Sequence, residues 1–383
     1  MEDLQETQPV LTVRGGFLKS FEQHVAVIRA LGFQTQIKIF HSLSSRKPLL
    51  LPLTVLVENV RGNEVQISHQ GGTLHNMIRS QTSIMFDVYG TDIQTIHVTY
   101  PFQCEEFDFV FFGDVHGVFS NLEQIIQATN ILDPLFVMAN GDMTHSGRLE
   151  DYHTLFDLVG HSKSPLFTSI GNHDRRVLGG RATYRKMLAP MYYSFSIKGC
   201  TFIVLDSSRK RGLQKFQYRW LERELQLAKH QRIFVFLHRP PICPKYNYLA
   251  FSSTPNARHF LTLMERHQVE MVFGSHIHVF TEFQKRNVRY IVTGGGGGAL
   301  WQPANVYHYL HVFVNKEEVD VRMVKLPTPE ANMTQRVKEA IKFNLEYHLA
   351  KNKRLKQAAI LGTTLLLSSS TIRHERRLRR RNR

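Results

Sequence analysis

The sequence repeats one arrangement five times: a short apolar run followed closely by side chains that bind metal ions. The first run, residues 107–112, leads to Asp114 and His116. Over all five runs, the side chains placed in this way are Asp114, His116, Asp142, Asn172, His238, His276 and His278. Carboxylate, amide and imidazole groups are typical ligands of divalent transition metals. Histidines scattered through a core would not recur at the ends of apolar runs, so we expect a metal centre.

The apolar runs are predicted to be strands of sheets that are covered on both faces. Residues 107–112 are rich in Phe and Val without polar alternation, which is typical of a central strand. Open α/β sheets bind ligands at the carboxyl ends of their strands. Apolar residues at helical spacing predict helices at 121–129, 217–230 and 261–267. Residues 105–327 are therefore predicted to form a mixed α/β sandwich with helices outside and the ligands at one edge.

Residues 1–104 are predicted to form a small, separate all-β domain. Short β-patterned runs bounded by Gly, Asn, Ser and Pro occur at 10–13, 35–40, 49–60, 65–69, 83–89 and 93–100. Strands at this spacing favour an antiparallel sandwich or barrel. One helix is predicted at residues 17–31. The scattered histidines of this region are interpreted as ordinary surface or core residues.

Cysteine usage and the N-terminal sequence favour a cytoplasmic protein. The 383 residues contain three cysteines, which are far apart and form neither a disulfide framework nor a metal-spaced cluster. No basic segment followed by an apolar segment begins the sequence, so no secretory signal is predicted. Peripheral binding at a membrane is the alternative, because of the C-terminal charge.

The C-terminal region, residues 328–383, is predicted to form a basic helical tail. Residues 334–357 contain seven basic and two acidic residues, and residues 371–383 contain seven and one, so these stretches carry +11 of the net +16. Apolar residues at helical spacing beside the lysines predict a basic amphipathic helix. Such a tail suits an anionic membrane surface or nucleic acid. A solvated tail without a partner is the alternative.

Five motifs in one order resemble the motif set of the calcineurin-like metallophosphoesterases. They are G-D-V-H-G at 113–117, G-D-M-T-H-S-G at 141–147, G-N-H-D at 171–174, H-R-P-P at 238–241 and G-S-H-I-H at 274–278. The resemblance covers residues 105–327. It implies a four-layer α/β/β/α sandwich that holds two divalent metal ions.

The resemblance also implies how the ligands are divided between the two ions. Asp142 is expected to bridge them, because neighbouring cations need a shared anionic ligand. The first site would be completed by Asp114, His116 and His278, and the second by Asn172, His238 and His276. Mixed nitrogen and oxygen ligation suits Mn, Fe or Zn better than Mg or Ca.

The predicted function is metal-dependent hydrolysis of a phosphate ester or pyrophosphate. A hydroxide bridging the metals would attack phosphorus, and His173 would protonate the leaving group. A role for His173 in merely holding Asn172 is the alternative. The substrate is expected to be a small-molecule, nucleotide or lipid-linked phosphate.

Residues beside the ligand motifs are predicted to support them or to bind substrate. His145 stands where many relatives have an acid that hydrogen-bonds the catalytic histidine, and it is expected to orient His173 as a neutral imidazole. Asp174 is expected to support its neighbouring ligands. Three arginines that follow ligand motifs are predicted to bind substrate phosphate: Arg175, Arg176 and Arg239.

Three alternatives to a small-molecule phosphoesterase stay open. A nuclease of the same fold would use the basic tail to bind the phosphate backbone. A lipid-linked pyrophosphatase would use the tail to reach the membrane. An inactive protein-binding scaffold would be expected to have lost one or two ligands, and the sequence has lost none.

Overall fold

The computed structural model describes residues 9–40, 52–90, 93–102, 105–300 and 306–327. All of them belong to the first of the chain's two units, residues 1–330. The basic tail predicted at residues 328–383 lies outside the described residues. Among the described helices, none has the length and apolar composition needed to span a bilayer.

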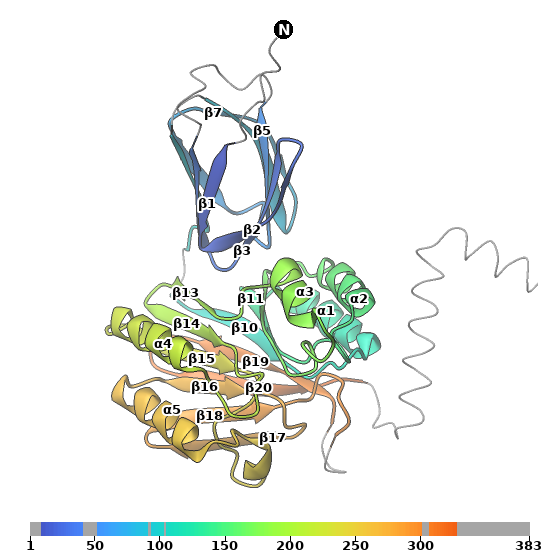
Figure 1. Ribbon diagram of the computed structural model, residues 1–383, viewed down its shortest axis with the longest axis vertical. Helices are drawn as coiled ribbons and strands as arrows, with labels where there is room; N and C mark the ends of the chain where they lie inside the picture. The colour runs from blue at the N-terminus through green and yellow to red at the C-terminus, as the bar shows by residue number, and fades with distance from the viewer. Residues whose placement is uncertain (1–8, 41–51, 91–92, 103–104, 301–305, 328–383) are drawn as a thin grey trace, which may run out of the picture. The chain divides into compact units, whose positions relative to one another are not determined.

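Two sheets form the α/β region (Figure 1). The first sheet has the order β12-β11-β10-β19-β20, with β10–β12 parallel and β19 and β20 antiparallel. Its strands are β10 (Phe107–Phe112), β11 (Phe136–Asn140), β12 (Leu166–Ser169), β19 (His308–Val314) and β20 (Val319–Lys325). The last two strands pair in antiparallel register as a hairpin.

The second sheet has the order β13-β14-β15-β16-β18-β17, with parallel central strands and an antiparallel strand at each edge. Its strands are β13 (Tyr193–Ile197), β14 (Cys200–Leu205), β15 (Arg232–Leu237), β16 (Met271–Gly274), β17 (Phe280–Lys285) and β18 (Val288–Thr293). Parallel strands that are buried on both faces need no polar alternation, which explains why these runs are almost wholly apolar.

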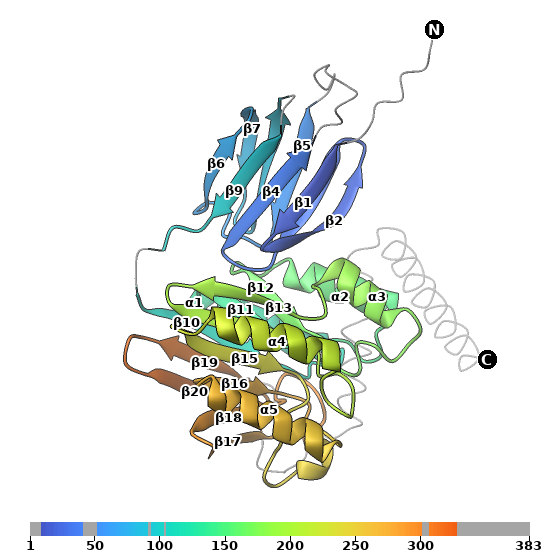
Figure 2. The ribbon, with the colours of Figure 1, turned by 60° about the vertical axis from the view of Figure 1, so that its left-hand side comes forward.

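Five α-helices cover these sheets, and α4 and α5 lie on the second sheet (Figure 2). They are α1 (Phe119–Leu132), α2 (Leu149–Val159), α3 (Gly180–Met187), α4 (Lys215–Leu227) and α5 (Thr254–Arg266). Leu221 of α4 and Phe260 of α5 pack into one buried cluster with Val235 of β15. The predicted mixed α/β sandwich is therefore confirmed.

Aromatic rings fill the space between the two sheets. Phe202 of β14 is fully buried, with ring centroids 5.1 Å from Phe234, 5.3 Å from Phe136 and 6.1 Å from Phe109. Two of these partners belong to the first sheet. The aromatic core thus holds together the two sheets whose strand ends carry the predicted ligands.

Removing the Phe202 ring should therefore destabilise the protein. We expect Phe202→Ala to lower the free energy of unfolding by about 3–5 kcal/mol, as is usual when a buried Phe is truncated. Phe216→Ala is the matched control, because that ring on α4 is 46% exposed. Urea denaturation of both variants measures the difference, and equal losses would contradict a central role for Phe202.

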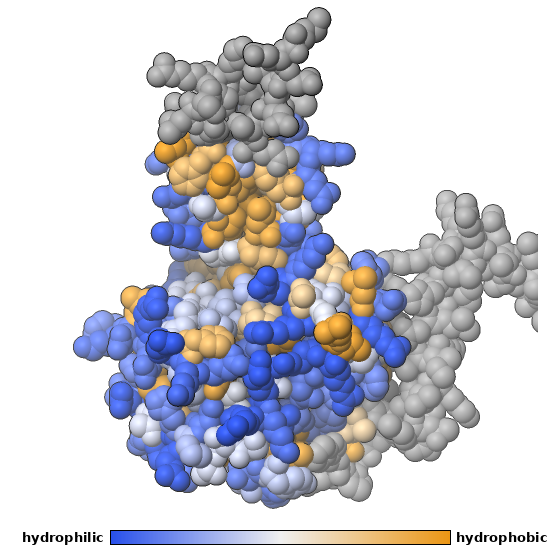
Figure 3. All heavy atoms as spheres, in the orientation of Figure 1, coloured by the Kyte–Doolittle hydropathy of each residue, from blue (hydrophilic) through white to orange (hydrophobic). Residues whose placement is uncertain are grey.

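Residues 10–99 form two further sheets and contain no helix in their described part. One sheet has the order β1-β4-β9-β6 and the other β2-β3-β5-β8-β7. The strands are β1 (Val10–Arg14), β2 (Gly16–Glu22), β3 (Val25–Ala30), β4 (Gln34–Phe40), β5 (Leu53–Glu58), β6 (Gln66–Gln70), β7 (Thr73–Arg79), β8 (Ser83–Tyr89) and β9 (Gln94–Thr99). The predicted all-β character is confirmed. Apolar side chains gather on one face of this region (Figure 3). Its exposed apolar residues include Val10 and Leu18.

The helix predicted at residues 17–31 is wrong. This stretch forms the hairpin of β2 and β3. Gln23 and His24 turn the chain with φ values of 47° and 63°, a conformation that a helix cannot contain. In β3, Ala26 and Ile28 are fully buried in alternate positions, so the apolar residues follow a period of two rather than the helical period.

Contacts join the all-β region to the α/β region within this unit. Arg29 is buried and donates hydrogen bonds to the backbone oxygens of Leu166 and Leu188, each at 3.1 Å. The side-chain oxygen of Asn59 accepts from the Leu166 amide at 2.7 Å. Independent folding of residues 1–104 stays a prediction.

Candidate metal centre

The predicted ligands lie at the carboxyl ends of strands from both sheets. Four of them have a left-handed backbone that is uncommon for residues other than glycine. The φ values are 59° at Asp114, 53° at His116, 51° at Asp142 and 69° at His276. Such strain persists only where the surrounding structure imposes it, and it clusters at functional sites.

Asp114, His116 and His278 form the first group, with one ligand atom of each within 4.8 Å of the others. Asp114 Oδ1 lies 3.5 Å from His116 Nε2 and 3.3 Å from His278 Nε2. Asp114 Oδ2 accepts a hydrogen bond from the His276 amide at 2.8 Å. One carboxylate oxygen is thus held by the backbone, and the other faces the two imidazoles.

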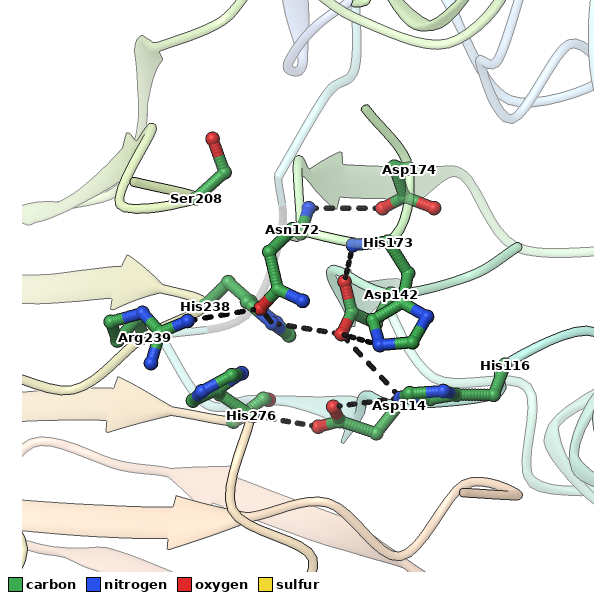
Figure 4. A network of polar contacts seen from close by, with 12 residues as sticks. Asp114, His116, Asp142, Asn172, His173, Asp174, Ser208, His238, Arg239 and His276 are labelled. Atoms are coloured by element: carbon green, nitrogen blue, oxygen red, sulfur yellow. Dashed lines mark hydrogen bonds and ion pairs between the residues drawn. The ribbon is translucent and has the colours of Figure 1, made fainter. Parts of the chain in front are cut away.

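Asp142, His238 and His276 form the second group, again with ligand atoms within 4.8 Å. Asp142 Oδ2 lies 3.2 Å from His238 Nε2. Asn172 joins this group, because its Oδ1 lies 3.3 Å from the same His238 nitrogen (Figure 4). The structure therefore brings together the ligands predicted for the second site.

Asp142 stands between the two groups. Its Oδ2 lies 3.4 Å from His116 Nε2 of the first group as well as 3.2 Å from His238 Nε2 of the second. Its Oδ1 accepts from the His173 amide at 2.6 Å. This is the position expected of a ligand shared by two cations.

Unsatisfied polar atoms show that these residues fit metal ions. Asp114 Oδ1 and His116 Nε2 are buried without a hydrogen-bond partner among the described residues. Burying such atoms without a partner costs free energy. Two divalent cations between the groups would satisfy them, and the mixed imidazole, amide and carboxylate donors suit Mn, Fe or Zn.

Backbone carbonyls set which nitrogen of each imidazole faces the centre. His238 Nδ1 lies 3.1 Å from the Asn140 oxygen, and His278 Nδ1 lies 2.7 Å from the Ala299 oxygen. Each Nδ1–H therefore donates to a carbonyl, which leaves Nε2 as the ligand atom. Such outer contacts orient metal-binding histidines in proteins.

Glycines after β18 pack directly against the ligands. A Cβ atom at Gly294 would lie 2.8 Å from Asp114 Oδ2, and one at Gly298 would lie 2.3 Å from His278 Cε1. Neither contact is sterically tolerable without a shift. The glycine run at 294–298 thus makes room for two ligands of the first group.

Carboxylates raise the pKa of two ligand histidines in the metal-free protein. Burial opposes the charged imidazole, but the carboxylates of Asp114 and Asp142 outweigh it and raise the pKa of His116 to about 9. Burial likewise opposes the charge of His238, and Asp142 raises its pKa to about 9. Both histidines are therefore protonated at neutral pH before metal binds.

Metal binding at pH 7 should release about two protons, one from His116 and one from His238, because a metal needs the neutral imidazole. Calorimetric titration in buffers of different ionisation enthalpy measures this number. As the pH rises above both pKa values, the number of protons released on metal binding should fall toward zero. Binding without proton release at pH 7 would contradict the raised pKa values of these two histidines.

His173 faces the centre from the G-N-H-D loop. Its Nε2 lies 4.0 Å from Asp142 Oδ2, and its Nδ1 lies 2.7 Å from the backbone oxygen of His145. Burial lowers the pKa of His173 to about 4. The imidazole is thus neutral, with Nδ1–H donating to the carbonyl and Nε2 toward the centre.

His145 holds His173 through its backbone carbonyl, whereas the sequence suggested a role for its side chain. The exposed His145 ring lies 5.9 Å from the His173 ring, centroid to centroid. A ring nitrogen of His145 still lies within 4.8 Å of ligand atoms of His116 and His173. The main chain therefore supplies the orienting contact.

Asp174 fixes the two loops that carry Asp142 and Asn172. Its Oδ1 accepts from the Thr144 amide at 2.9 Å, and its Oδ2 accepts from the Gly171 amide at 2.9 Å. The carboxyl is fully buried, and burial together with Asp142 raises its pKa to about 6. Asp174 thus acts on ligand loops rather than on an ion.

The three predicted arginines take different positions. Arg239 donates to the Leu249 oxygen at 2.6 Å and to Asn172 Oδ1 at 3.4 Å, beside the second group. Arg175 donates to Ser208 Oγ at 3.2 Å. Arg176 is exposed, and its amide donates to the His173 oxygen at 3.1 Å.

Two polar contacts near the centre were missed from the sequence. Asn140 is fully buried and donates to the Leu237 oxygen and to Ser275 Oγ, each at 3.0 Å, and so ties three strand ends together. Ser207 Oγ accepts from the Arg239 amide at 2.8 Å. Asn140 could have been recognised in the sequence by its position directly before the G-D motif. Nothing in the sequence distinguishes Ser207.

Comparison with known proteins places the motifs in one family. Residues 107–280 match the family model described as calcineurin-like phosphoesterase. A 3′,5′-cyclic-nucleotide phosphodiesterase from Nostoc sp. is 23% identical over 55% of this chain and 77% of that protein. The glycerophosphodiester phosphodiesterase GpdQ from Enterobacter lignolyticus is 27% identical over 46% of this chain and 66% of that protein.

Other similar proteins include a phosphatase. The serine/threonine-protein phosphatase CPPED1 of Mus musculus is 26% identical over 46% of this chain and 65% of that protein. Among solved structures, a dimetal phosphatase from Danio rerio has a TM-score of 0.48 and 15% identity, covering 57% of this chain and 96% of that chain.

Proposed function

The chain belongs to the calcineurin-like phosphoesterase family through residues 107–280, and on that premise we propose that it hydrolyses phosphate esters at the centre around Asp142. The similar proteins are phosphodiesterases and a phosphatase, which supports a phosphoric ester hydrolase. The proposal rests mainly on one observation: the Asp142 carboxylate lies close to histidines of both ligand groups.

The ligand residues would hold two divalent ions, of Mn, Fe or Zn. Asp114, His116 and His278 would bind one ion, His238, His276 and Asn172 the other, with Asp142 shared. When bound, the ions supply positive charge for the phosphate oxygens and acidify a water molecule. The protein's part is to keep the two carboxylates ionised and the Nε2 atoms directed inward.

His173 is the proposed proton donor. In the hydrolysis, a bond forms between the water oxygen and phosphorus, the bond between phosphorus and the leaving oxygen breaks, and the leaving oxygen takes a proton. His173 Nε2 faces the centre, and its Nδ1–H is fixed by the His145 carbonyl. The low pKa without substrate means that Nε2 must gain its proton when the anionic phosphate arrives, since a nearby negative charge favours imidazolium.

The test is hydrolysis of paired aryl phosphate monoester and diester substrates by protein reloaded with Mn. Turnover supports the proposal, and the ratio of the two rates indicates the substrate class. Absence of turnover together with absence of bound metal by elemental analysis would overturn it and favour the scaffold alternative.

The nuclease and lipid-linked pyrophosphatase alternatives rest on the basic tail, which lies outside the described residues. Binding of an anionic membrane or of nucleic acid by that tail therefore stays a proposal. The scaffold alternative gains no support, because the described residues include every predicted ligand, and these converge.

A further inference from the structure

Three arginines and one carboxylate lie near one another beside the proposed metal centre. Asp206 follows β14, and its Oδ2 lies 3.6 Å from Arg181 Nη2 of α3. The charged neighbours of Arg175 are Asp206, Arg209 and Arg181. Arg181 thus pairs with Asp206, and Arg175 has both Arg181 and Arg209 as charged neighbours, so the cluster holds more positive than negative charge.

Hydrogen bonds hold the side chains of this cluster in fixed positions. Ser208 donates its amide and its hydroxyl to Asp206 Oδ1 at 3.1 Å and 2.5 Å. The same hydroxyl oxygen accepts from Arg175 Nη1 at 3.2 Å. Ser208 is 5% exposed, whereas the Arg181 side chain is 44% exposed, so a buried base presents accessible guanidinium groups.

Two connections tie the cluster to the centre. Arg175 follows the G-N-H-D loop and stands two positions after His173, the proposed proton donor. On the other side, Ser207 Oγ accepts from the amide of Arg239, which directly follows the ligand His238. Figure 4 shows Ser208 on the side of the centre where Asn172 and Arg239 lie. The cluster thus borders the Asn172 and His238 side of the centre.

We propose that Arg175, Arg181 and Arg209 form a second anion site, which binds a phosphoryl group adjoining the one that is attacked. The preferred substrate is then a pyrophosphate diester rather than an ester of a single phosphate. Guanidinium groups bind phosphate oxygens through paired, charge-assisted hydrogen bonds. A cluster with more guanidinium groups than carboxylates has unbalanced positive charge, which favours binding of an anion.

This inference rests on the proposed hydrolysis and adds the substrate class to it. Water adds to one phosphorus, the bridging P–O–P bond breaks, and the departing phosphate oxygen keeps the electron pair. A departing phosphate is a better leaving group than an alkoxide, and the second anion site would hold it by its negative charge. No further reactant is required.

Binding of a nonhydrolysable probe tests the site. Calorimetry with Mn-loaded protein compares α,β-methylene-ADP, which has two phosphorus atoms, with AMP, which has one. We expect the dissociation constant of the two-phosphorus probe to be lower than that of AMP by about tenfold or more. Hydrogen bonds to charged groups contribute enough binding free energy for a difference of this size. Arg181→Gln and Arg209→Gln, made separately and together, should reduce this advantage, with the double variant losing most of it.

Arg185→Gln is the matched control, since it removes the same charge from the exposed face of α3. An equal loss in this control would overturn the proposal, because long-range charge would then explain the binding. An unchanged advantage in the double variant would overturn it as well.

Hydrolysis of the p-nitrophenyl esters of AMP and ADP separates this inference from the proposed function. If the AMP ester is hydrolysed and the ADP ester is not preferred, the second anion site fails and the hydrolase stands. If neither ester is hydrolysed but the arginines still favour the two-phosphorus probe, the hydrolase fails and the anion site stands.

Discussion

Asp142→Asn should lose both hydrolysis and metal, with kcat/KM lower by more than about 100-fold. Even the outer contacts of a metal site typically cost about 10- to 100-fold when they are removed, and Asp142 faces both ligand groups directly. Its Oδ2 lies 3.4 Å from His116 Nε2 and 3.2 Å from His238 Nε2. An amide keeps the shape but removes the negative charge that two neighbouring cations need between them.

The measurement combines aryl phosphate hydrolysis with elemental analysis of bound metal. Asp320→Asn is the matched control, because it makes the same change at a carboxylate that pairs with Arg322 on the exposed side of β20. This control should keep its metal and its rate. If Asp142→Asn kept both metals per chain and most of its rate, Asp142 would not be the shared ligand.

His173→Ala should lower kcat by about 10²- to 10⁴-fold while both metals stay bound, as is usual when a general acid is removed. The Nε2 atom of His173 points to the centre, and its ring nitrogen Nδ1 is fixed at 2.7 Å from the His145 oxygen. Removing the ring leaves the leaving oxygen without a proton donor. The amide that donates to Asp142 Oδ1 is retained.

A series of aryl and alkyl phosphate esters distinguishes proton donation from a structural role. The loss should be largest for the poorest leaving groups, because those need the proton most. His145→Ala keeps the carbonyl that accepts from Nδ1, so its rate should fall far less, and His230→Ala after α4 is a surface control. An equal loss for every ester, together with loss of metal, would show that His173 only holds Asn172.

The proposed ligand set could be predicted from the sequence because its members closely follow strands. Asp114, Asp142 and His238 come within two residues of the ends of β10, β11 and β15. Parallel strands bring their carboxyl ends to one edge, so local order along the chain translates into nearness in space. The α/β sandwich and the resemblance to the family were predicted from the same repeated pattern of an apolar strand followed by candidate ligands.

Three strands at sheet edges escaped prediction, although β1 and β6, at other edges, were predicted. The strands β7, β13 and β17 lie at the edges of their sheets, and β7 is exposed at nearly every position. A strand as exposed as β7 buries little surface, so it carries little apolar pattern to recognise. The hairpin at residues 16–30 was mistaken for a helix because its apolar residues are dense enough to fit either period.

The sequence by itself was enough to predict the order of the strands that lead to the proposed metal ligands, and to propose those ligands and their chemistry. Tertiary structure alone decided that a backbone carbonyl of His145 orients His173, and that Ser208 joins Arg175 to Asp206. Strand periodicity and ligand type are local properties that the chain carries in its residue order. Contacts between side chains dozens of residues apart depend on where each loop leaves its sheet, and no local pattern encodes that.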